Sequence, residues 1–300
     1  MSKPLSENIE GIYPLMLTPF NDDLTIDYKT YEEYCDFQVS KGTAHLFCVC
    51  GSSEMKELTL DERVKLATLT AKHKQDLTIV ASANLESTQE KRIEEVKRMS
   101  QTGVDGLVFT VRDMGDKPDE LVAHVKELES YTDLPIFMYE YPGFDNHLIS
   151  GDTYGRLVRE CKIKGIKDTT CTMEGITAKL ARKGDSVVIQ ANMPFLYKAY
   201  EAGSRGVMAT PTSCGAQYFQ RFHDAFVSGD KEKAKQYFYD IINLDDAIDN
   251  GFNVSAKYLV YLQGVKGFKP INRSKRTLSP ARLESLRAYH DYAKYMGLMD

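Results

Sequence analysis

The stretch PIFMYEYPGFDNHLISGDTYGRLVRECKIKGIKD, residues 135–168, decides the fold class of this chain. Two short apolar runs, Pro135–Tyr141 and Ile163–Asp168, lie on either side of an amphipathic segment, Gly151–Cys161. Strands covered on both faces have nearly continuous apolar runs, and strands joined through a helix run parallel. The stretch therefore predicts one strand–helix–strand unit of a parallel sheet.

The same alternation continues outward from this unit in both directions. The expected strands are Ile12–Leu17, His45–Cys50, Leu77–Ala83, Gly106–Val111, Pro135–Tyr141, Ile163–Asp168, Ser186–Ala191 and Gly206–Thr210. The expected helices between them are Tyr28–Lys41, Thr59–Lys74, Ser87–Gln101, Pro118–Tyr131, Gly151–Cys161, Met173–Arg182 and Pro194–Ala202. This pattern predicts an α/β fold, a closed (β/α)8 TIM barrel. The alternative is an open doubly wound sheet, but no glycine-rich dinucleotide motif follows the first run.

The alternation stops beyond residue 215. The remaining amphipathic runs predict helices only, at Ala216–Val227, Lys231–Asn250, Val254–Gln263 and Pro280–Met296. No linker rich in proline, glycine or serine separates them from the barrel. We therefore expect residues 1–215 to form the barrel and residues 216–300 to form a C-terminal helical appendage packed on it, within a single structural unit.

Composition argues against several classes of function. The 38 basic and 43 acidic residues are well mixed and give a net charge of −5, which disfavours nucleic acid as a partner. No apolar run approaches the ~18 residues that cross a membrane, and the polar start MSKPLSENIEG lacks a signal-peptide core. The six cysteines are scattered, as is typical of buried thiols in a reducing compartment. We expect a cytoplasmic protein with no membrane partner.

The sequence offers no evident metal or cofactor site. The six histidines do not gather at the ends of the expected strands. No group of cysteines and histidines has the spacing of a zinc site. A metal-dependent enzyme is therefore disfavoured, and we expect chemistry that needs neither a metal nor a cofactor.

Ligand chemistry in such barrels lies at the carboxyl ends of the strands, and Lys167 is the sharpest candidate there. It lies within an apolar strand, where burial lowers the pKa of an amine. A neutral amine can attack a carbonyl carbon to form a Schiff base. The alternative is a lysine that reaches solvent at the strand edge or pairs with Asp168.

Two further strand ends carry candidate groups. Tyr139 ends the preceding strand, so its phenol can reach Lys167 and move protons; the alternative is a core tyrosine, one of 18. The turn Gly51-Ser52-Ser53 offers backbone N–H groups and hydroxyls that can hold a carboxylate. The alternative there is an ordinary Ser/Gly turn.

These pieces together resemble the N-acetylneuraminate lyase/dihydrodipicolinate synthase (DapA-like) superfamily of class I aldolases, over nearly the whole chain. The residues that carry the resemblance are Thr18-Pro19-Phe20, Cys50-Gly51-Ser52-Ser53-Glu54, Leu58-Thr59 with Glu62-Arg63 downstream, Tyr139-x-x-Pro142, Gly165-Ile166-Lys167-Asp168 and Gly203-x-x-Gly206-Val207. The resemblance implies that Lys167 forms the Schiff base, that Tyr139 moves protons, and that Ser52 or Ser53 binds the carboxylate of a 2-oxo acid. It also implies a homotetramer, a dimer of dimers.

Several positions depart from the family pattern. Glu140 stands where the family's Tyr-Asn-x-Pro motif has asparagine, and Phe144 stands where the synthases carry an arginine for the aldehyde substrate. The segment Val111–Met114 lacks the tyrosine pair that completes the synthases' proton relay. Ala191–Pro194 lacks the acidic residues with which neuraminate lyases hold the sugar tail. These departures count against both lysine biosynthesis and neuraminate cleavage.

We therefore expect a Schiff-base-forming lyase, aldolase or dehydratase acting on pyruvate or another 2-oxo acid, such as a 2-keto-3-deoxy sugar acid. One alternative is a 4-hydroxy-tetrahydrodipicolinate synthase with an altered proton relay, and another is a non-catalytic metabolite-binding barrel. We expect four further residues to bind the substrate: Glu140, Arg112, Asn192 and Thr210. Glu140 could instead orient Tyr139, and Arg112 could instead pair with Asp113 on a solvated loop.

Overall fold

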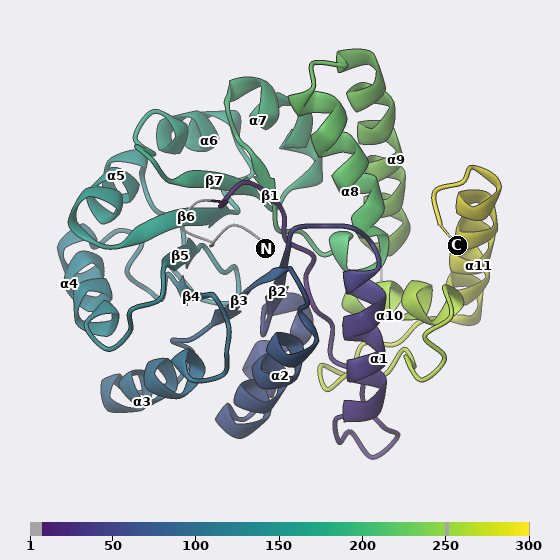
Figure 1. Ribbon diagram of the computed structural model, residues 1–300, viewed down its shortest axis with the longest axis horizontal. Helices are drawn as coiled ribbons and strands as arrows, with labels where there is room; N and C mark the ends of the chain where they lie inside the picture. Colours follow the sequence, from purple (N-terminus) through teal and green to yellow (C-terminus); the bar gives the residue numbers. More distant parts are fainter. Residues whose placement is uncertain (1–7, 250–251, 300) are drawn as a thin grey trace.

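The structure, a computed structural model, describes residues 8–249 and 252–299 (Figure 1). Eight parallel strands form one sheet in the order β1-β8-β7-β6-β5-β4-β3-β2. An isolated parallel bridge between Leu15 and Phe47 joins the two ends of this sheet and closes the ring. The expected (β/α)8 barrel is confirmed.

Strands and helices alternate as the sequence predicts. The strands are β1 (Gly11–Ile12), β2 (His45–Cys48), β3 (Thr78–Ser82), β4 (Gly106–Thr110), β5 (Ile136–Tyr139), β6 (Ile163–Asp168), β7 (Val187–Gln190) and β8 (Gly206–Val207). The helices of the ring are α1 (Tyr28–Val39), α2 (Leu60–His73), α3 (Gln89–Ser100), α4 (Pro118–Glu129), α5 (Gly151–Glu160), α6 (Met173–Leu180), α7 (Leu196–Ala202) and α8 (Thr212–Val227). Most strands end earlier than their apolar runs predict, because the last residues leave the sheet to form loops.

Side-chain caps fix where the helices begin. Five N-cap residues each accept a hydrogen bond from the backbone N–H three residues further on: Asp27, Thr59, Thr88, Ser150 and Thr172. These caps satisfy N–H groups that have no partner within the helix. The five helices therefore begin within about two residues of the starts that the sequence predicts.

Successive side chains of a strand point alternately into the barrel and outward to the helices. In the interior, the ring of Phe137 fills the space beside Gly165, where an added Cβ would lie 2.7 Å from that ring. Glycine at this position lets the strands close around the aromatic side chain. The barrel interior is therefore packed at this level of β5 and β6.

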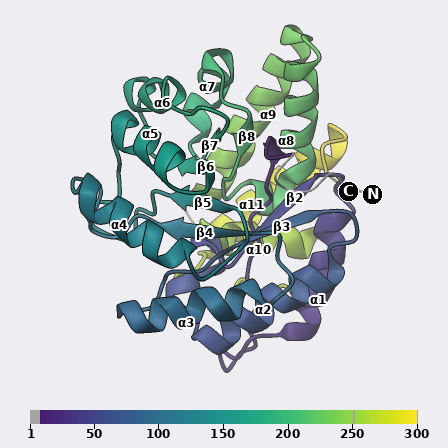
Figure 2. The same cartoon turned by 60° about the vertical axis from the view of Figure 1, so that its left-hand side comes forward.

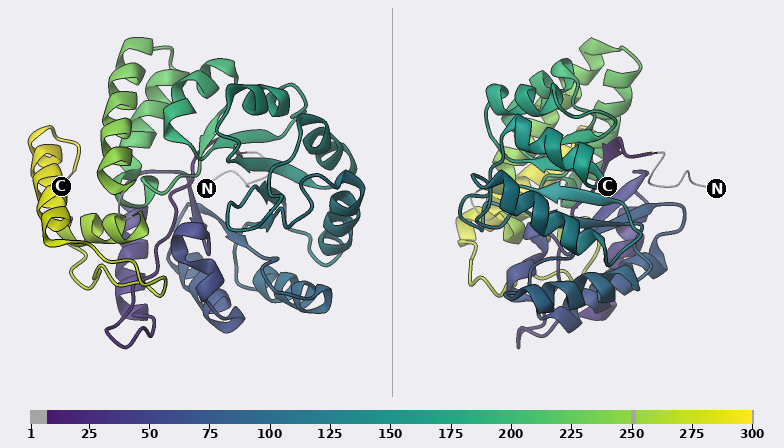
Figure 3. Two further views of the ribbon diagram at one scale, coloured as in Figure 1. Left: turned by 180° about the vertical axis from the view of Figure 1, so that it is seen from behind. Right: turned by 90° about the vertical axis from the view of Figure 1, so that its left-hand side faces the viewer.

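Three helices lie beyond the ring: α9 (Lys231–Asp249), α10 (Asn253–Leu262) and α11 (Pro280–Tyr295). Figure 2 shows α9 beside α8, and Figure 3 shows α11 at the periphery. The Lys257 ammonium on α10 lies 2.6 Å from the carboxylate of Glu54, which follows β2, and this ion pair is buried. Glu54 also accepts a hydrogen bond from the backbone N–H of Arg273, at 2.7 Å. A single carboxylate thus ties the C-terminal segment to the mouth of the barrel.

The boundary expected at residue 215 falls inside α8, which follows β8 as the last helix of the ring. Three parts of these expectations lie outside the described residues: residues 1–7 of the barrel segment, Asn250 at the end of the expected helix Lys231–Asn250, and Asp300. The division into barrel and appendage stays a prediction. Within the described residues, no helix combines the length and the apolar character that crossing a bilayer requires.

Candidate active site

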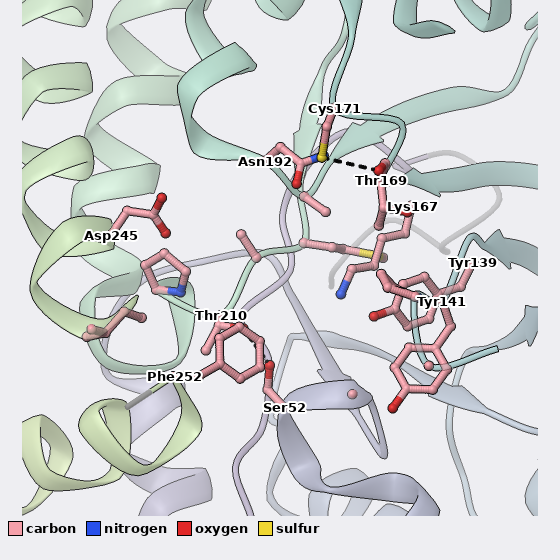
Figure 4. Close-up of a pocket in the computed structure, with 18 of the residues that line it drawn as sticks. Ser52, Tyr139, Tyr141, Lys167, Thr169, Cys171, Asn192, Thr210, Asp245 and Phe252 are labelled. Carbon is pink, nitrogen blue, oxygen red and sulfur yellow. Dashed lines mark hydrogen bonds between the residues drawn. The ribbon is translucent and has the colours of Figure 1, made fainter. Parts of the chain in front are cut away.

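A cavity of about 420 Å³ opens at the carboxyl ends of the strands (Figure 4). Its wall contains six of the residues singled out from the sequence: Gly51, Ser52, Tyr139, Lys167, Asn192 and Thr210. The structure therefore brings together side chains from β5, β6 and the segments that follow β2, β7 and β8. Within the described residues, no group of three or more His, Cys, Asp or Glu side chains could hold a metal ion.

Lys167 points into this cavity from β6. Its side chain is 4% exposed, and its Nζ lies 4.2 Å from the centre of the Tyr139 ring. In the described part of the chain, the amine has no hydrogen-bond or carboxylate partner. Burial lowers the pKa of this lysine to about 8, and the nearby Cys50 thiol offsets the effect only in part. About a tenth of the amine is therefore neutral at pH 7, far more than for an ordinary lysine.

Asp168 does not pair with Lys167, because adjacent residues of a strand point to opposite sides. Its carboxylate lies in the outer layer, 3.2 Å from the ammonium of Lys179 on α6, and accepts a hydrogen bond from the backbone N–H of Thr170 at 2.8 Å. The other alternative, a lysine that reaches solvent at the strand edge, is also not seen, since Lys167 is buried. The geometry leaves this amine free to react.

Tyr139 is in register with Lys167 across β5 and β6. Its hydroxyl lies close over Gly51, where an added Cβ would be 3.2 Å from that oxygen, so the glycine makes room for the phenol. Burial raises the pKa of Tyr139 well above 10, and the neighbouring Cys50 and Tyr141 add to this effect. The phenol therefore keeps its proton at neutral pH and can donate it to a reacting oxygen.

The two serines of the turn after β2 point in different directions. The Ser52 hydroxyl lies 2.7 Å from the Thr210 hydroxyl, and both residues line the cavity. The Ser53 hydroxyl instead donates to the Met16 carbonyl at 2.5 Å and accepts from the Cys50 N–H at 3.0 Å. The sequence left open which hydroxyl meets the ligand, and in the structure only Ser52 lines the cavity.

Glu140 does not reach the cavity, and a direct substrate contact there does not fit the structure. Because Tyr139 points inward, the next side chain along β5 points outward. The fully buried Glu140 carboxylate lies 2.8 Å from the Lys179 ammonium and accepts from the backbone N–H groups of Ile149, at 2.9 Å, and Thr169, at 3.1 Å. Burial raises the pKa of this carboxyl, while Lys179 counteracts the rise. Glu140 thus anchors the loops that follow β5 and β6.

Arg112 also lies outside the cavity wall. Its guanidinium stacks on the Phe144 ring at 4.2 Å and donates to the backbone carbonyls of Leu85, at 2.6 Å, and Asn84, at 3.3 Å. This position does not fit the expected substrate contact, and within the described residues Arg112 forms no ion pair with Asp113. The carbonyls at the end of β3 and the aromatic ring hold this side chain in place.

The cavity also contains residues that the sequence did not single out. Tyr141 and Thr169 line it from the loops after β5 and β6, and Asp245 and Asp249 line it from α9. The two aspartates are four residues apart, a spacing that places them on one face of a helix. That spacing was the available signal, but the position of α9 beside the mouth of the barrel depends on tertiary packing.

Comparison with known proteins identifies the class of protein that this fold and site define, a (β/α)8 lyase of class I aldolase type. The chain belongs to the dihydrodipicolinate synthetase family, whose family model matches residues 8–285. The resemblance predicted from the sequence is therefore confirmed.

Individual relatives are similar over most of the chain. The 4-hydroxy-tetrahydrodipicolinate synthase of Pseudoalteromonas atlantica is 26% identical over 264 residues, covering 85% of this chain and 88% of that protein. The dihydrodipicolinate synthase from Aquifex aeolicus superposes with a TM-score of 0.85 at 21% identity, covering 97% and 99% of the two chains. YagE, a prophage protein from E. coli K12 solved in complex with pyruvate, gives a TM-score of 0.87 at 19% identity, covering 97% and 99%.

Proposed function

We propose that Lys167 forms a Schiff base with a 2-oxo acid and that the enzyme then breaks or makes a bond beside the former carbonyl carbon. The observation that carries this proposal is a buried amine, with a pKa lowered to about 8, beside a phenol at the wall of a cavity. Attack by the neutral amine on the carbonyl carbon releases water and leaves an iminium. When the bond beside the former carbonyl carbon breaks, the iminium accepts its electron pair, and an enamine is left on the lysine.

Tyr139 supplies the proton transfers in this scheme. Its phenol, held protonated by burial, can donate to the departing carbonyl oxygen and recover the proton from a substrate hydroxyl during cleavage. The Ser52–Thr210 pair of hydroxyls, which lines the same cavity, supports a role in binding the 2-oxo acid carboxylate. Asn192, which also lines the cavity, is then available for the rest of the substrate.

The proposed substrate class is pyruvate or a 2-keto-3-deoxy sugar acid. The second candidate is 4-hydroxy-tetrahydrodipicolinate synthesis, because that is the name of the similar proteins from Pseudoalteromonas atlantica and Geobacter metallireducens. Against it, Phe144 occupies the place of the synthases' arginine, and its ring contacts the cations of Lys56 and Arg112. The aldehyde carboxylate that the synthases bind there would meet an aromatic ring instead.

An activity screen distinguishes the two candidates. Purified enzyme is incubated with a panel of 2-keto-3-deoxy acids and pyruvate release is measured, and in parallel the enzyme receives pyruvate with aspartate semialdehyde. We expect pyruvate from at least one sugar acid and no condensation product. Rapid condensation with aspartate semialdehyde and no sugar-acid cleavage would contradict the first candidate. The Lys167→Met variant is the control for both assays.

We also propose a cytoplasmic location and a homo-oligomeric state, a dimer of dimers. All six cysteines, Cys35, Cys48, Cys50, Cys161, Cys171 and Cys214, are free thiols, which supports a reducing compartment. Exposed aromatic side chains such as Tyr131 and Tyr295 support an interface between copies of the chain. Light scattering at micromolar concentration is expected to give a multiple of the 33.9 kDa chain mass, and a monomer would contradict the proposal.

A further inference from the structure

The cavity has more room than pyruvate needs. Its volume of about 420 Å³ falls in the range of roughly 300–1,000 Å³ that holds drug-sized ligands. The Lys167 amine and the Tyr139 phenol occupy one side, and Figure 4 shows Asp245 on the far side of the cavity from them. The space between belongs to the part of the substrate that lies beyond the 2-oxo acid group.

The charges of this wall are unequally distributed. Among the described lining residues, Lys167 is the single cation, and it is assigned to the carbonyl carbon. Lys56 and Arg112 do not line the cavity: Lys56 donates to the Gly143 carbonyl at 3.0 Å, and Arg112 donates to the Leu85 carbonyl at 2.6 Å. A second carboxylate on the substrate would therefore find no free cation in the described wall.

Asp245 gives the far side a negative charge. It is half-buried on α9, and within the described residues its carboxylate has no hydrogen-bond or ion-pair partner. Burial raises the pKa of Asp245 to about 6, with Asp246 and Asp249 adding to the rise, so the group is mainly ionised at neutral pH. An unpaired anion in a concave wall attracts hydrogen-bond donors and repels a second anion.

Asn192 supplies the complementary group. The residue lines the cavity, and its side-chain Nδ2, which is buried, has no hydrogen-bond partner in the described structure, so the amide must rotate to present this donor to a ligand. A carboxylate that accepts and an amide that donates together suit hydroxyl groups, which do both. They suit a lone cation less well, because the amide donor would stay unpaired.

We propose that Asp245 is a specificity-determining residue that selects substrates whose distal half carries hydroxyl groups and rejects those that end in a second carboxylate. The inference rests on the proposed Schiff-base function and deepens it. Rejection by an unpaired like charge is a common way in which a binding site discriminates between similar ligands. Asp249, one helical turn further on at the rim, adds charge of the same sign.

Competitive trapping tests the proposal without requiring turnover. Equal amounts of 2-keto-3-deoxygluconate, which has distal hydroxyls, and 2-keto-3-deoxyglucarate, which ends in a carboxylate, are mixed with enzyme and borohydride. One acid carries ¹³C in its first three carbons, so mass spectrometry assigns each adduct to its source even after cleavage to pyruvate. The variants are Asp245→Asn, which removes the charge at constant shape, and Asp246→Asn, which removes an equal charge from an exposed neighbour outside the cavity.

We expect wild-type enzyme and Asp246→Asn to favour the hydroxylated acid by about ten- to a hundredfold, as for one charge-assisted hydrogen bond, and Asp245→Asn to lose most of this preference. A merely structural role for Asp245 would lower both adducts and leave their ratio unchanged. An unchanged ratio in Asp245→Asn, a wild-type preference for the dicarboxylate, or trapping of neither acid while pyruvate is trapped would overturn the inference and leave the Schiff-base proposal standing. Failure to trap pyruvate itself would overturn the proposed function and this inference with it.

Discussion

Two buried lysines lie on opposite sides of the same strand wall, and they differ in whether a carboxylate lies beside them. Lys167 projects into the cavity from β6 and has no carboxylate beside it in the described structure. Lys179, on α6, is fully buried in the outer layer and lies 2.8 Å from Glu140 and 3.2 Å from Asp168. Burial alone therefore does not make a lysine a nucleophile; the absence of a counter-ion separates the two.

A third buried lysine sharpens this lesson. The pKa of Lys257 is also lowered to about 8 by burial. Its ammonium, however, lies 2.6 Å from the Glu54 carboxylate and 2.7 Å from the Ile271 carbonyl, and it lines no part of the cavity. A lowered pKa indicates a reactive amine only where the amine also faces space that a substrate can enter.

The outer ion cluster, formed by Lys179, Glu140 and Asp168, holds two strand ends together. Glu140 and Asp168 each follow one of the proposed catalytic residues along the chain, and both hold Lys179. The Glu140 carboxylate also accepts a hydrogen bond from the backbone N–H of Thr169, and Thr169 lines the cavity. The ion cluster therefore ties the ends of β5 and β6 together behind Tyr139 and Lys167.

Removing the outer lysine should have the largest effect. Lys179→Met leaves two buried carboxylates without their cation, which typically costs about 3–5 kcal/mol of stability. Urea denaturation at pH 7 measures the free energy of unfolding. In the double variant Lys179→Met/Glu140→Gln one carboxylate is neutral, so we expect part of the loss to be recovered. A free energy within about 1 kcal/mol of wild type for the single variant would contradict the role of the ion cluster.

Removing the inner phenol should affect turnover and not folding. Tyr139→Phe keeps the ring and deletes the hydroxyl, and loss of a general acid–base group costs about 10²–10⁴-fold in rate. We expect kcat for the substrate identified in the screen to fall by that factor while the borohydride adduct with pyruvate still forms. Wild-type kcat in this variant would exclude Tyr139 from proton transfer. Tyr154→Phe, which removes a buried hydroxyl that does not line the cavity, is the matched control.

Removing the inner lysine should stabilise the protein, the opposite sign from Lys179. The pKa of Lys167 falls from 10.5 to about 8 on folding, so its burial costs roughly 3 kcal/mol below pH 8. The cost fades as the pH rises through 8 toward 10.5, because the unfolded lysine then loses its proton as well. Lys167→Met should therefore gain up to about 3 kcal/mol at pH 7 and much less at pH 10.5. Urea denaturation at both pH values measures this; destabilisation at pH 7 would mean that the amine is paired.

The pH dependence of imine formation is the smallest of these effects. With a pKa of about 8, the neutral fraction of the Lys167 amine rises about tenfold from pH 6 to 7 and levels off above pH 8. Stopped-flow or quenched trapping with subsaturating pyruvate measures the rate. A rate that kept rising to pH 10 would indicate an ordinary exposed lysine.

The sequence predicted the inner side of this wall better than the outer. Tyr139 and Lys167 were expected together because parallel neighbours bring their strand ends side by side, and β5 and β6 place them in register. Glu140 was expected in the cavity although strand alternation, once Tyr139 is placed inside, directs it outward. A carboxylate at a strand end is chemically suited to bind substrate, but the direction of its side chain decides whether it can.

Other features depended on contacts that no local pattern contains. Arg112 follows a strand end as expected, but the carbonyl groups of Asn84 and Leu85 bind it away from the cavity. Asp245 lies 35 residues after Thr210, the last expected site residue, on a helix whose amphipathic pattern predicts its existence and not its docking position. The fold was thus readable from repeated local patterns, and the far wall of the site was not.

The central claim is that the unpaired inner lysine is the nucleophile, and one trapping experiment tests it most directly. Wild-type enzyme, Lys167→Met and Lys179→Met are each incubated with pyruvate and borohydride, and the adduct is located by peptide mass spectrometry. We expect one pyruvate-derived adduct per chain on Lys167 in wild type, none in Lys167→Met, and an adduct still on Lys167 in whatever fraction of Lys179→Met remains folded. An undiminished adduct in Lys167→Met, or an adduct on Lys179 or Lys257 in the wild-type protein, would contradict the account.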